Sequence, residues 1–390
     1  MKYYIIAGEA SGDLHGSNLM KGLYARDPEA DIRFWGGPMM DAVFHANQEG
    51  GGMVRDYKDG AVMGFVEVAL KARKFLGKIT DCKKDILAWG PDVVILIDYP
   101  GFNLKIASFA RKAGIKVFYY IAPKVWASRE SRIRKLRDDV DTLFIVFPFE
   151  VPYFEKKGVK AVYKGNPLID AIDGSPAMHN TSREDFLRSA GLDGAPFIAL
   201  LPGSRSNELK FMIPRLAALA DRLHADPEFA GFRYIVAGAP SRKEEDYLEL
   251  VSGREGFVSV LFGKTYDILR HAEAAGIKAG TASLEAALIG TPQVVGYGVD
   301  SRISFLIGRT IIRTPFISLG NLILGRSAFR ELLQYYMTPE NLETEVRRLV
   351  GDLPYRERMK ADYAEIRALL GGSGASEAVA EEMITQLKQA

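Results

Sequence analysis

Residues 280–287 read Gly-Thr-Ala-Ser-Leu-Glu-Ala-Ala and closely follow a short apolar run, Ala274 to Lys278. This order predicts a strand, a tight turn of small residues and a helix that ends at Gly290. The first N–H groups of such a helix have no partner within it, and the helix dipole adds partial positive charge there. The turn therefore suits a diphosphate, and Glu285 is close enough to it to accept a hydrogen bond from a ribose hydroxyl.

A second turn of this kind lies upstream, where the apolar run Phe197–Leu201 leads into Pro202-Gly203-Ser204-Arg205-Ser206-Asn207-Glu208. Arg205 is the side chain expected to stabilise negative charge on a departing nucleoside diphosphate. A single glycine after a strand is often no more than a turn. Two anion-holding turns in one half of the chain indicate a nucleotide-sugar site.

Short apolar runs alternate with amphipathic stretches along the whole chain, a pattern typical of parallel sheets covered by helices. The expected strands are Tyr3–Ala7, Ile32–Trp35, Val93–Asp98, Lys116–Ile121 and Leu143–Phe147 in the first half, and Phe197–Leu201, Arg233–Ala237, Val258–Leu261, Ala274–Lys278 and Gln293–Tyr297 in the second. Helices are expected at Leu14–Ala25 and Leu104–Ala113. The fold class is therefore α/β, with two Rossmann-like domains that hold ligands at the carboxyl ends of their strands, in a cleft between them.

A polar stretch rich in glycine and proline, between about Gly165 and Arg183, predicts the boundary between the two domains. We expect an N-terminal domain at 1–170, on the acceptor and membrane side, and a C-terminal domain for the nucleotide-sugar donor at 185–340. Residues 341–390 have charged, helical periodicity and are expected to form a tail that packs back on an N-terminal domain, either its own or a neighbour's. A homodimer is thus left open.

Composition excludes several classes of protein. The 390 residues carry 51 basic and 49 acidic side chains, so the basic excess of a nucleic-acid binder is missing. The single cysteine, Cys82, cannot form an internal disulfide, which favours a reducing compartment such as the cytoplasm. The sequence lacks the roughly 18 consecutive apolar residues of a membrane span, and the apolar run Tyr3–Ala7 is too short for a signal peptide.

The first half carries two loops with candidate chemistry. Asp98 closes a strongly apolar run before Asn103, and a carboxylate at the mouth of a buried strand can be desolvated and basic enough to deprotonate a sugar hydroxyl. A helix-capping aspartate would give the same pattern. The loop after the first strand holds Glu9, Ser11 and Asp13, which suit a hydroxyl-rich or phosphorylated ligand, although Asp13 could instead cap the helix that follows.

No metal or cofactor is expected. The five histidines are scattered and Cys82 stands alone, without ligand spacing. Asp139-Val140-Asp141 has the form of a metal–diphosphate motif but precedes a predicted strand, so we interpret it as a solvated helix end. The glycine-rich loop lacks the G-x-G-x-x-G spacing, which counts heavily against a nicotinamide-dependent oxidoreductase.

One segment suggests contact with a membrane surface. The apolar residues Val62, Met63, Phe65, Val66 and Leu70 precede the basic Lys71, Arg73, Lys74 and Lys78. An apolar helical face next to basic residues is typical of an interfacial helix on anionic lipid. A buried core helix with a charged end is the alternative.

Taken together, these motifs resemble those of the lipid A disaccharide synthases, glycosyltransferases of the GT-B fold. The resemblance runs nearly end to end and rests on Gly8-Glu9-Ala10-Ser11-Gly12-Asp13, Val62-Met63-Gly64-Phe65-Val66-Glu67, Ile97-Asp98-Tyr99-Pro100-Gly101-Phe102-Asn103, Val125-Trp126-Ala127, Phe147-Pro148-Phe149-Glu150, Leu201-Pro202-Gly203-Ser204-Arg205, Gly280-Thr281-Ala282-Ser283-Leu284-Glu285 and Ser318-Leu319-Gly320-Asn321-Leu322.

The resemblance implies an inverting, metal-independent transfer of 2,3-diacylglucosamine from its UDP derivative to 2,3-diacylglucosamine 1-phosphate. The products would be a β-1′,6-linked disaccharide 1-phosphate and UDP. It also implies peripheral attachment to the cytoplasmic face of the inner membrane. The nearest alternative is a UDP-N-acetylglucosamine 2-epimerase, which shares the fold but needs no lipid acceptor.

The resemblance assigns Asp98 as the candidate general base. The expected nucleotide-sugar residues are Ser204, Arg205, Glu208, Thr281, Ser283, Glu285 and Asn321, and those of the acceptor cleft are Glu9, Ser11, Asp13 and Asn103. The chain departs from the family pattern at Lys124 and Ser128, on either side of Val-Trp-Ala, and at Asn166, where a histidine is common.

Overall fold

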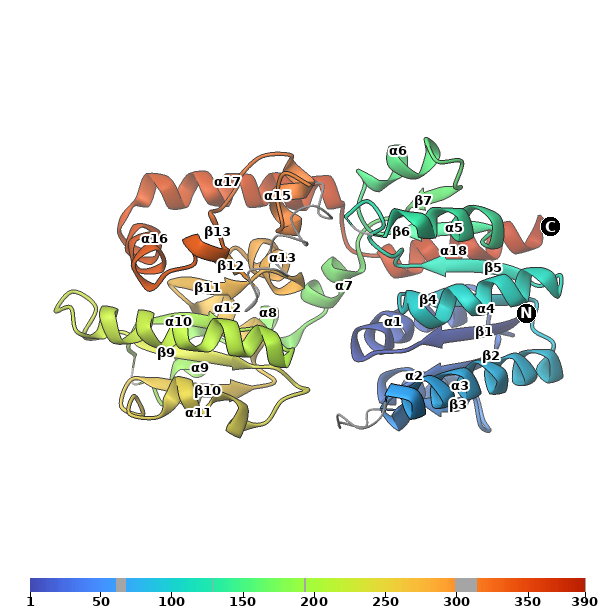
Figure 1. Cartoon of the computed structure of the whole chain (residues 1–390), viewed down its shortest axis with the longest axis horizontal. Coiled ribbons are helices and arrows are strands. Elements are labelled where there is room, and N and C mark those ends of the chain that lie inside the picture. The colour runs from blue at the N-terminus through green and yellow to red at the C-terminus, as the bar shows by residue number, and fades with distance from the viewer. Residues whose placement is uncertain (61–67, 128, 193, 299–313, 390) are drawn as a thin grey trace. The chain divides into compact units, whose positions relative to one another are not determined.

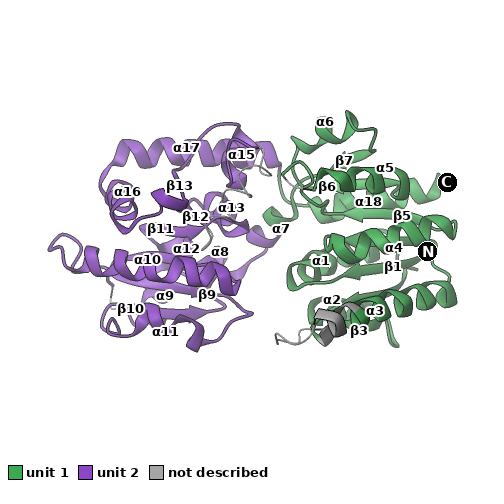
Figure 2. Ribbon diagram, in the orientation of Figure 1, with its two compact units in different colours: residues 1–170, 372–390 green, residues 171–371 purple. Residues whose placement is uncertain are grey.

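The computed structural model describes residues 1–60, 68–127, 129–192, 194–298 and 314–389. The described chain divides into two compact units, one formed by Met1–Asp170 together with Gly372–Ala390 and the other by Ala171–Gly371 (Figure 2). We call them unit 1 and unit 2.

Unit 1 is built on a parallel sheet with the strand order β3-β2-β1-β4-β5-β6-β7 (Figure 1). Its strands are β1 (Lys2–Ala7), β2 (Asp31–Gly36), β3 (Met53–Asp56), β4 (Val93–Ile97), β5 (Lys116–Tyr120), β6 (Thr142–Ile145) and β7 (Ala161–Tyr163). Its helices are α1 (Ala10–Arg26), α2 (Pro38–Asn47), α3 (Val68–Trp89), α4 (Pro100–Lys112), α5 (Ile133–Asp139), α6 (Glu150–Glu155) and α18 (Ala375–Lys388), with short 3-10 turns η1 (Tyr57–Gly60) and η2 (Glu130–Arg132). Helix α7 (Pro167–Asp173) crosses the boundary into unit 2.

Unit 2 repeats the architecture with the strand order β10-β9-β8-β11-β12-β13. Its strands are β8 (Phe197–Leu201), β9 (Arg233–Gly238), β10 (Val258–Phe262), β11 (Ala274–Lys278), β12 (Gln293–Tyr297) and β13 (Glu331–Leu333). Its helices are α8 (Pro176–His179), α9 (Arg183–Ser189), α10 (Ser206–His224), α11 (Leu248–Val251), α12 (Thr265–His271), α13 (Thr281–Ile289), α15 (Leu319–Leu324), α16 (Pro339–Gly351) and α17 (Leu353–Leu370), with 3-10 turns η3 (Glu244–Tyr247) and η4 (Gln334–Tyr336). The two parallel sheets confirm the predicted α/β class.

Central strands such as β4 and β8 are apolar and buried along their whole length, as is typical of parallel sheets covered by helices on both faces. In unit 1, Tyr4 and Ile6 of β1 and Leu96 of β4 pack against residues of α3, α4 and α5, such as Ile86 and Phe102. Helices α1, α2 and α18 pack with one another in the same unit. In unit 2, β8 and β11 form the centre of an equivalent core.

In each unit the order in which the chain adds strands to the sheet reverses between two neighbouring, parallel central strands. Strands β1 and β4 pair so that Ala7 lies beside Ile97, and β8 and β11 pair so that Leu201 lies beside Ile277. The loops that follow paired strands on either side of such a switch point diverge and leave a crevice at the carboxyl ends. The fold therefore brings together the loops after Ala7 and Ile97 in unit 1, and those after Leu201 and Lys278 in unit 2.

The C-terminal region divides between the units, which differs from the single tail expected at 341–390. Helices α16 and α17 belong to unit 2, where α17 packs on α13 and α15. Only α18 packs in unit 1, against α1. The chain crosses at Gly371-Gly372, where Gly371 has a φ of 81° that favours glycine.

Candidate active site

Asp98 lies in a turn that its neighbours hold in an uncommon conformation. Asp98 and Tyr99 both have a φ of 45°, in the left-handed region that residues other than glycine rarely adopt. The buried Asn103 donates from Nδ2 to the carbonyl oxygens of Ile97 (3.1 Å) and Asp98 (2.8 Å), and the Tyr119 hydroxyl donates to the latter at 2.5 Å. Asn103 therefore positions the turn that carries Asp98.

The surroundings of Asp98 make its carboxylate more basic. Burial raises the pKa of Asp98, and the negative charge of Glu9 raises it further, while Lys124 and Arg132 lower it. Glu9 precedes α1 directly and Ser11 lies in its first turn, and both residues are exposed. The switch point thus places Glu9 near the carboxyl that the sequence identifies as a candidate base.

Lys124 acts on Asp98 and also on a second acid, Glu150. Glu150 is buried and accepts hydrogen bonds from Trp126 Nε1 (2.8 Å) and the Phe147 N–H (3.2 Å). Burial raises the pKa of Glu150 to about 7, against the lowering effect of these bonds and of Lys124. The Lys124 ammonium lies 5.6 Å from the centre of the Phe147 ring. The positive charge at position 124 therefore stabilises both carboxylates.

Asp13 has a structural partner that sequence reasoning did not identify. Its buried carboxylate accepts hydrogen bonds from the N–H groups of Gly37 (2.9 Å), Met39 (3.0 Å) and Met40 (3.0 Å). Asp13 therefore caps the N-terminus of α2, not that of α1, the helix in which it lies.

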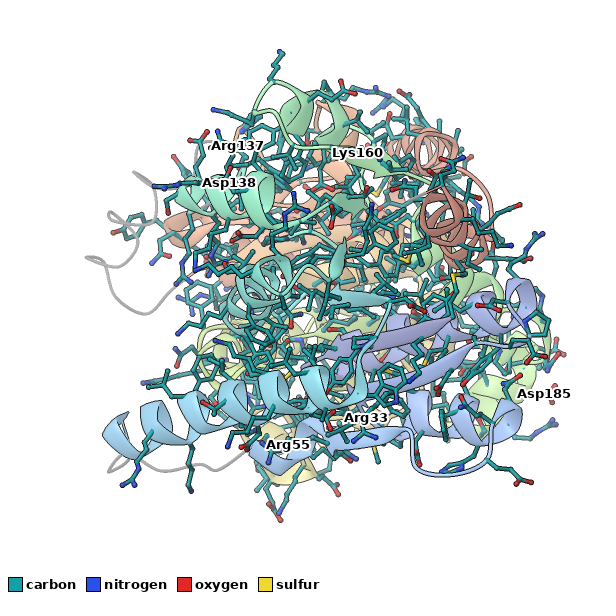
Figure 3. The ribbon with its side chains drawn as sticks, turned by 90° about the vertical axis from the view of Figure 1, so that its right-hand side faces the viewer. Arg33, Arg55, Arg137, Asp138, Lys160 and Asp185 are labelled. Atoms are coloured by element: carbon teal, nitrogen blue, oxygen red, sulfur yellow. The ribbon has the colours of Figure 1, made fainter. Side chains whose placement is uncertain are left out.

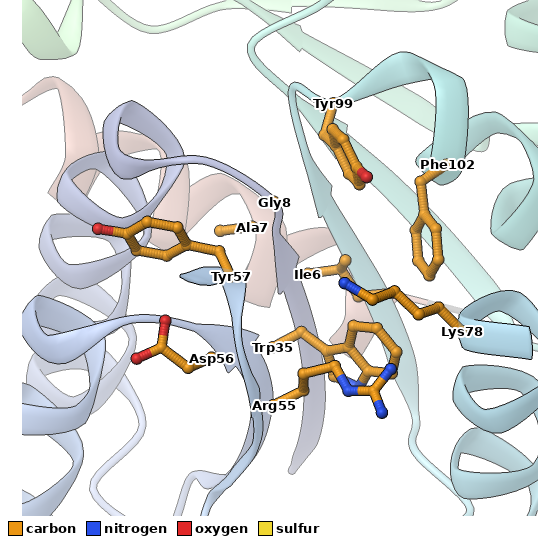
Figure 4. Close-up of a pocket in the computed structure, with 10 residues that line it drawn as sticks. All are labelled: Ile6, Ala7, Gly8, Trp35, Arg55, Asp56, Tyr57, Lys78, Tyr99 and Phe102. Atoms are coloured by element: carbon orange, nitrogen blue, oxygen red, sulfur yellow. The ribbon is translucent and has the colours of Figure 1, made fainter. Parts of the chain in front are cut away.

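A small pocket lies next to the Asp98 turn (Figure 4). It is lined by Ile6, Ala7, Gly8, Trp35, Arg55, Asp56, Tyr57, Lys78, Tyr99 and Phe102. A Cβ on Gly8 would lie 2.2 Å from a carbon of the Tyr99 ring, so glycine is needed for this ring to close over the strand. Aromatic and aliphatic groups form the floor, and the two basic side chains reach in from β3 and α3 (Figure 4).

In unit 2, Glu208 organises the turn after β8. Its carboxylate accepts from the N–H groups of Ser204 (3.1 Å) and Arg205 (3.2 Å) and pairs with Lys278 Nζ at 2.6 Å. Gly203 has a φ of 103°, and a Cβ there would lie 2.6 Å from a Glu208 oxygen. The Arg205 side chain is 79% exposed, and its guanidinium lies 3.6 Å from a Glu208 oxygen. Glu208 shapes the turn, and Arg205 remains the group that can reach a ligand.

Sequence reasoning missed two cations at this turn. Arg242 donates to the Ser204 carbonyl oxygen at 2.6 Å and to Ser206 Oγ at 3.0 Å. Lys278, the partner of Glu208, ends β11. A lysine at the carboxyl end of a buried strand could have been noticed in the sequence, whereas Arg242 gives no such signal.

The turn before α13 has the expected open N-terminus. The residue before the helix is Gly280, so no side chain caps the first N–H groups, and Thr281 is exposed. Ser283 is buried and donates to the Gly280 carbonyl oxygen at 2.8 Å, which fixes the turn itself. Glu285 accepts from the Tyr266 hydroxyl at 3.1 Å, and burial raises the pKa of its carboxyl.

Asn321 has all its amide hydrogen bonds within the protein. Nδ2 donates to the Phe329 carbonyl oxygen and to Glu331, both at 3.0 Å, and Oδ1 accepts from the N–H of Ala328 at 2.8 Å. Glu331 in turn accepts from the N–H of Ser318 at 2.9 Å. Asn321 therefore ties α15 to the segment before β13.

The remaining predicted residues give a mixed result. Val62, Met63, Phe65 and Val66 lie outside the described residues, and Leu70 lies in the first turns of α3, where only the backbone is described. Among the residues that are described, no group of three or more His, Cys, Asp or Glu side chains could hold a metal ion. Asp141 pairs instead with Arg111 at 3.0 Å. Nor is any helix in the described part of the chain long and apolar enough to cross a membrane.

Comparison with known proteins identifies the family. The family model described as lipid-A-disaccharide synthetase matches residues 3–384. The chain belongs to this family.

Three relatives of the same name are similar in sequence to this chain over nearly its full length. A lipid-A-disaccharide synthase from Geobacter metallireducens is 37% identical over 384 residues, covering 98% of this chain and 96% of the relative. The enzyme of the same name from Syntrophus aciditrophicus is 37% identical over 387 residues, covering 99% and 97%, and that from Myxococcus xanthus is 35% identical over 383 residues, covering 98% and 97%. The chain is thus a glycosyltransferase of this family.

Solved structures extend the comparison to the fold. A UDP-N-acetylglucosamine 2-epimerase from Listeria monocytogenes, described as putative, matches with a TM-score of 0.66 at 14% identity, covering 100% of this chain and 97% of that one. The calicheamicin glycosyltransferase CalG4 matches with a TM-score of 0.59 at 16% identity, covering 100% and 98%. These likenesses confirm the GT-B fold and, at such identities, nothing further about activity.

Two departures from the synthase pattern now have a structural setting. Lys124 lies where its charge acts on Asp98 and Glu150. Asn166, at the position where a histidine is common, donates to the Val146 carbonyl oxygen (2.8 Å) and accepts from the Leu168 N–H (2.9 Å). In this chain Asn166 thus anchors the start of α7, while Ser128 lies outside the described residues.

Proposed function

We propose that the chain transfers 2,3-diacylglucosamine, with inversion and without a metal ion, from its UDP derivative to the 6-hydroxyl of 2,3-diacylglucosamine 1-phosphate. Membership of the family over residues 3–384 carries the proposal and implies a UDP-sugar and a sugar phosphate as substrates. The products are the β-1′,6-linked disaccharide 1-phosphate and UDP.

In the acceptor half, Asp98 takes the proton of the attacking hydroxyl. Its raised pKa supports this role, because a more basic carboxylate is a better proton acceptor. Asn103 holds the turn, and Glu9 keeps the carboxyl basic. Ser11 is exposed in the first turn of α1, within the part of unit 1 that would receive the acceptor.

In the donor half, the open N-terminus of α13 and the exposed Arg205 hold the diphosphate. Backbone N–H groups and a guanidinium offset the charge that develops on UDP as the glycosidic bond breaks. Thr281 adds a hydroxyl at the same end of the helix, and Glu285 accepts from a ribose hydroxyl. Ser204, Glu208 and Ser283 act indirectly by shaping these turns, and Asn321 by tying α15 to the segment before β13.

Membrane contact is part of the proposal, since both substrates are acylated. The apolar segment from Val62 to Leu70 and the exposed Arg73 and Lys74 of α3 would attach the enzyme to anionic lipid at the cytoplasmic face of the inner membrane.

Release of UDP tests the proposal directly. The enzyme is incubated in detergent and EDTA with UDP-2,3-diacylglucosamine, with and without 2,3-diacylglucosamine 1-phosphate. We expect release that requires the acceptor and is unaffected by the chelator. Release without the acceptor would favour an epimerase-like reaction, and loss of release in EDTA would contradict metal independence.

A further inference from the structure

We propose that the pocket beside the Asp98 turn binds the phosphate of the acceptor sugar, between Arg55 of β3 and Lys78 of α3. The inference rests on the proposed function and names the residues that recognise the phosphomonoester. Of the pocket's side chains, these two are the cations, and they approach it from opposite sides (Figure 4).

Arg55 is held in place on a rigid aromatic platform. Its guanidinium carbon lies 5.1 Å from the centre of the Trp35 ring. Trp35 is fixed in turn, because its Nε1 donates to the Tyr4 hydroxyl at 2.9 Å and that hydroxyl donates to Asp85 at 2.7 Å. A guanidinium stacked in this way loses little freedom when it binds an anion.

Among the residues that the structure describes, the charge of Arg55 is only weakly neutralised. Its carboxylate contact, Asp81, is 61% exposed and lies 3.8 Å away, beyond the roughly 2.7–2.9 Å of a charge-assisted hydrogen bond. The nearby Arg33 provides a contrast, since it forms a bidentate pair with Asp85 at 2.9 and 2.6 Å. Both arginines lie close to α3 (Figure 3).

The pocket lining includes one acid, Asp56, whose carboxylate is directed away from Arg55 (Figure 4). Along β3 successive side chains point to opposite faces. Asp56 therefore lies on the other side of the strand from Arg55 (Figure 4), where its Oδ1 accepts from the Lys58 N–H at 2.8 Å.

The pocket is also in the right place for the acceptor. Two of its walls, Gly8 and Tyr99, are the direct neighbours in sequence of Glu9 and Asp98. A sugar whose hydroxyl contacts Asp98 would have its remaining substituents beside this wall. The aromatic and aliphatic floor lowers the local dielectric, which strengthens the attraction between a phosphate dianion and two cations.

Binding of two lipids that differ only in the phosphate tests the assignment. Full-length wild type, Arg55→Gln and Lys78→Gln are titrated in detergent with 2,3-diacylglucosamine 1-phosphate and with 2,3-diacylglucosamine. We expect each substitution to raise the Kd of the phosphorylated lipid about tenfold, as for a lost charged hydrogen bond, and to leave the other Kd unchanged. Lys84→Gln, at an exposed position of the same helix, is the matched control and should behave as wild type.

Other results would overturn the assignment. An equal loss of affinity for both lipids would mean that Arg55 and Lys78 pack against the sugar or its acyl chains. Weaker sedimentation of the variants with phosphatidylglycerol vesicles that contain no acceptor would mean that it binds lipid head groups. If Arg55→Gln fails to fold, Arg55→Lys replaces it, with an expected loss smaller than tenfold but still confined to the phosphorylated lipid.

The transfer reaction itself is checked separately with the wild type. Acceptor-dependent UDP release together with unchanged binding in both variants would leave the proposed function intact and remove the phosphate site. Phosphate-dependent binding without any UDP release would support the site and contradict the transfer. A wild type that binds both lipids equally would overturn the site.

Discussion

At the scale of single residues, a substitution at Asp98 tests the proposed general base most directly. We expect Asp98→Asn to lower kcat by at least about a hundredfold, because the amide cannot take the proton of the acceptor hydroxyl. UDP binding should be unchanged, since the donor turns belong to unit 2. Turnover and equilibrium UDP binding are measured side by side, with Asp92→Asn, at the exposed other end of β4, as the control. Turnover within a few-fold of wild type would require another base.

Glu9 should control the pH at which this base becomes active. Because the pKa of Asp98 is raised, activity should fall with decreasing pH at values above the ordinary range of an aspartate, as the carboxylate becomes protonated. Glu9→Gln removes a negative charge that contributes to this shift, so the acidic limb of kcat/KM should move to lower pH. Glu29→Gln, an exposed acid beyond the end of α1, should leave the limb in place. An unmoved limb in Glu9→Gln would show that Glu9 does not act on the titrating group.

Residue positions were easier to predict from the sequence than residue partners. Asp98 lies just beyond β4, as its place after an apolar run predicts, and Gly280-Thr281 opens a helix. Asp13 caps α2, and Asn321 bonds to Phe329 and Glu331. The last two arrangements depend on how separate elements pack, which no local pattern of polar residues reveals.

At the scale of elements, Asp170 fixes the start of the last helix. Its carboxylate accepts from the N–H groups of Gly374 (2.6 Å), Ala375 (3.2 Å) and Ser376 (2.9 Å), the open N-terminus of α18. Asp170→Asn replaces one acceptor oxygen with a donor, and we expect it to destabilise the docked helix by about 1–2 kcal/mol.

Hydrogen exchange in α18 is the direct measurement of this loss. We expect faster exchange of the amides of residues 375–388 in Asp170→Asn and little change elsewhere. Asp138→Asn, at a position on α5 where the acid pairs with Arg137 on the surface, should leave these amides protected (Figure 3). Equal protection in both variants would show that side-chain packing alone holds the helix.

At the same scale, the sequence pattern did not predict three of the described strands, and their position in the sheets explains why. The strands β3, β7 and β13 are three or four residues long and lie at sheet edges. Edge strands are only partly buried, so they lack the apolar runs that reveal central strands such as β8 and β11. Periodicity therefore located the core of each sheet and the edge strand β10, and missed the three shorter edge strands.

At the scale of the whole molecule, the sequence predicts helices after residue 338 but not how they divide between the units. Amphipathic periodicity shows that a helix packs on something, without identifying its partner. The division depends on contacts far apart in sequence, such as Arg26 with Glu377 at 2.9 Å in unit 1 and Arg367 with Asp173 at 2.6 Å in unit 2.

The attachment of the whole molecule to a membrane can be tested on described residues of α3. Arg73 and Lys74 are exposed there, and Leu76 exposes 55% of its surface. Each basic side chain near an anionic surface contributes about 1 kcal/mol, so Arg73→Gln with Lys74→Gln should weaken binding to phosphatidylglycerol vesicles by roughly thirtyfold. The measurement is sedimentation with vesicles at low salt, and the difference from wild type should shrink as salt screens the charges.

Lys84→Gln with Lys112→Gln removes the same charge from exposed positions at the far end of α3 and at the end of α4. If this control loses as much affinity, attraction follows net charge and α3 is not the contact. Turnover of detergent-dispersed substrates should be unchanged in the Arg73–Lys74 variant, because detergent removes the need for a membrane surface, and a loss there would indicate a direct role in substrate binding.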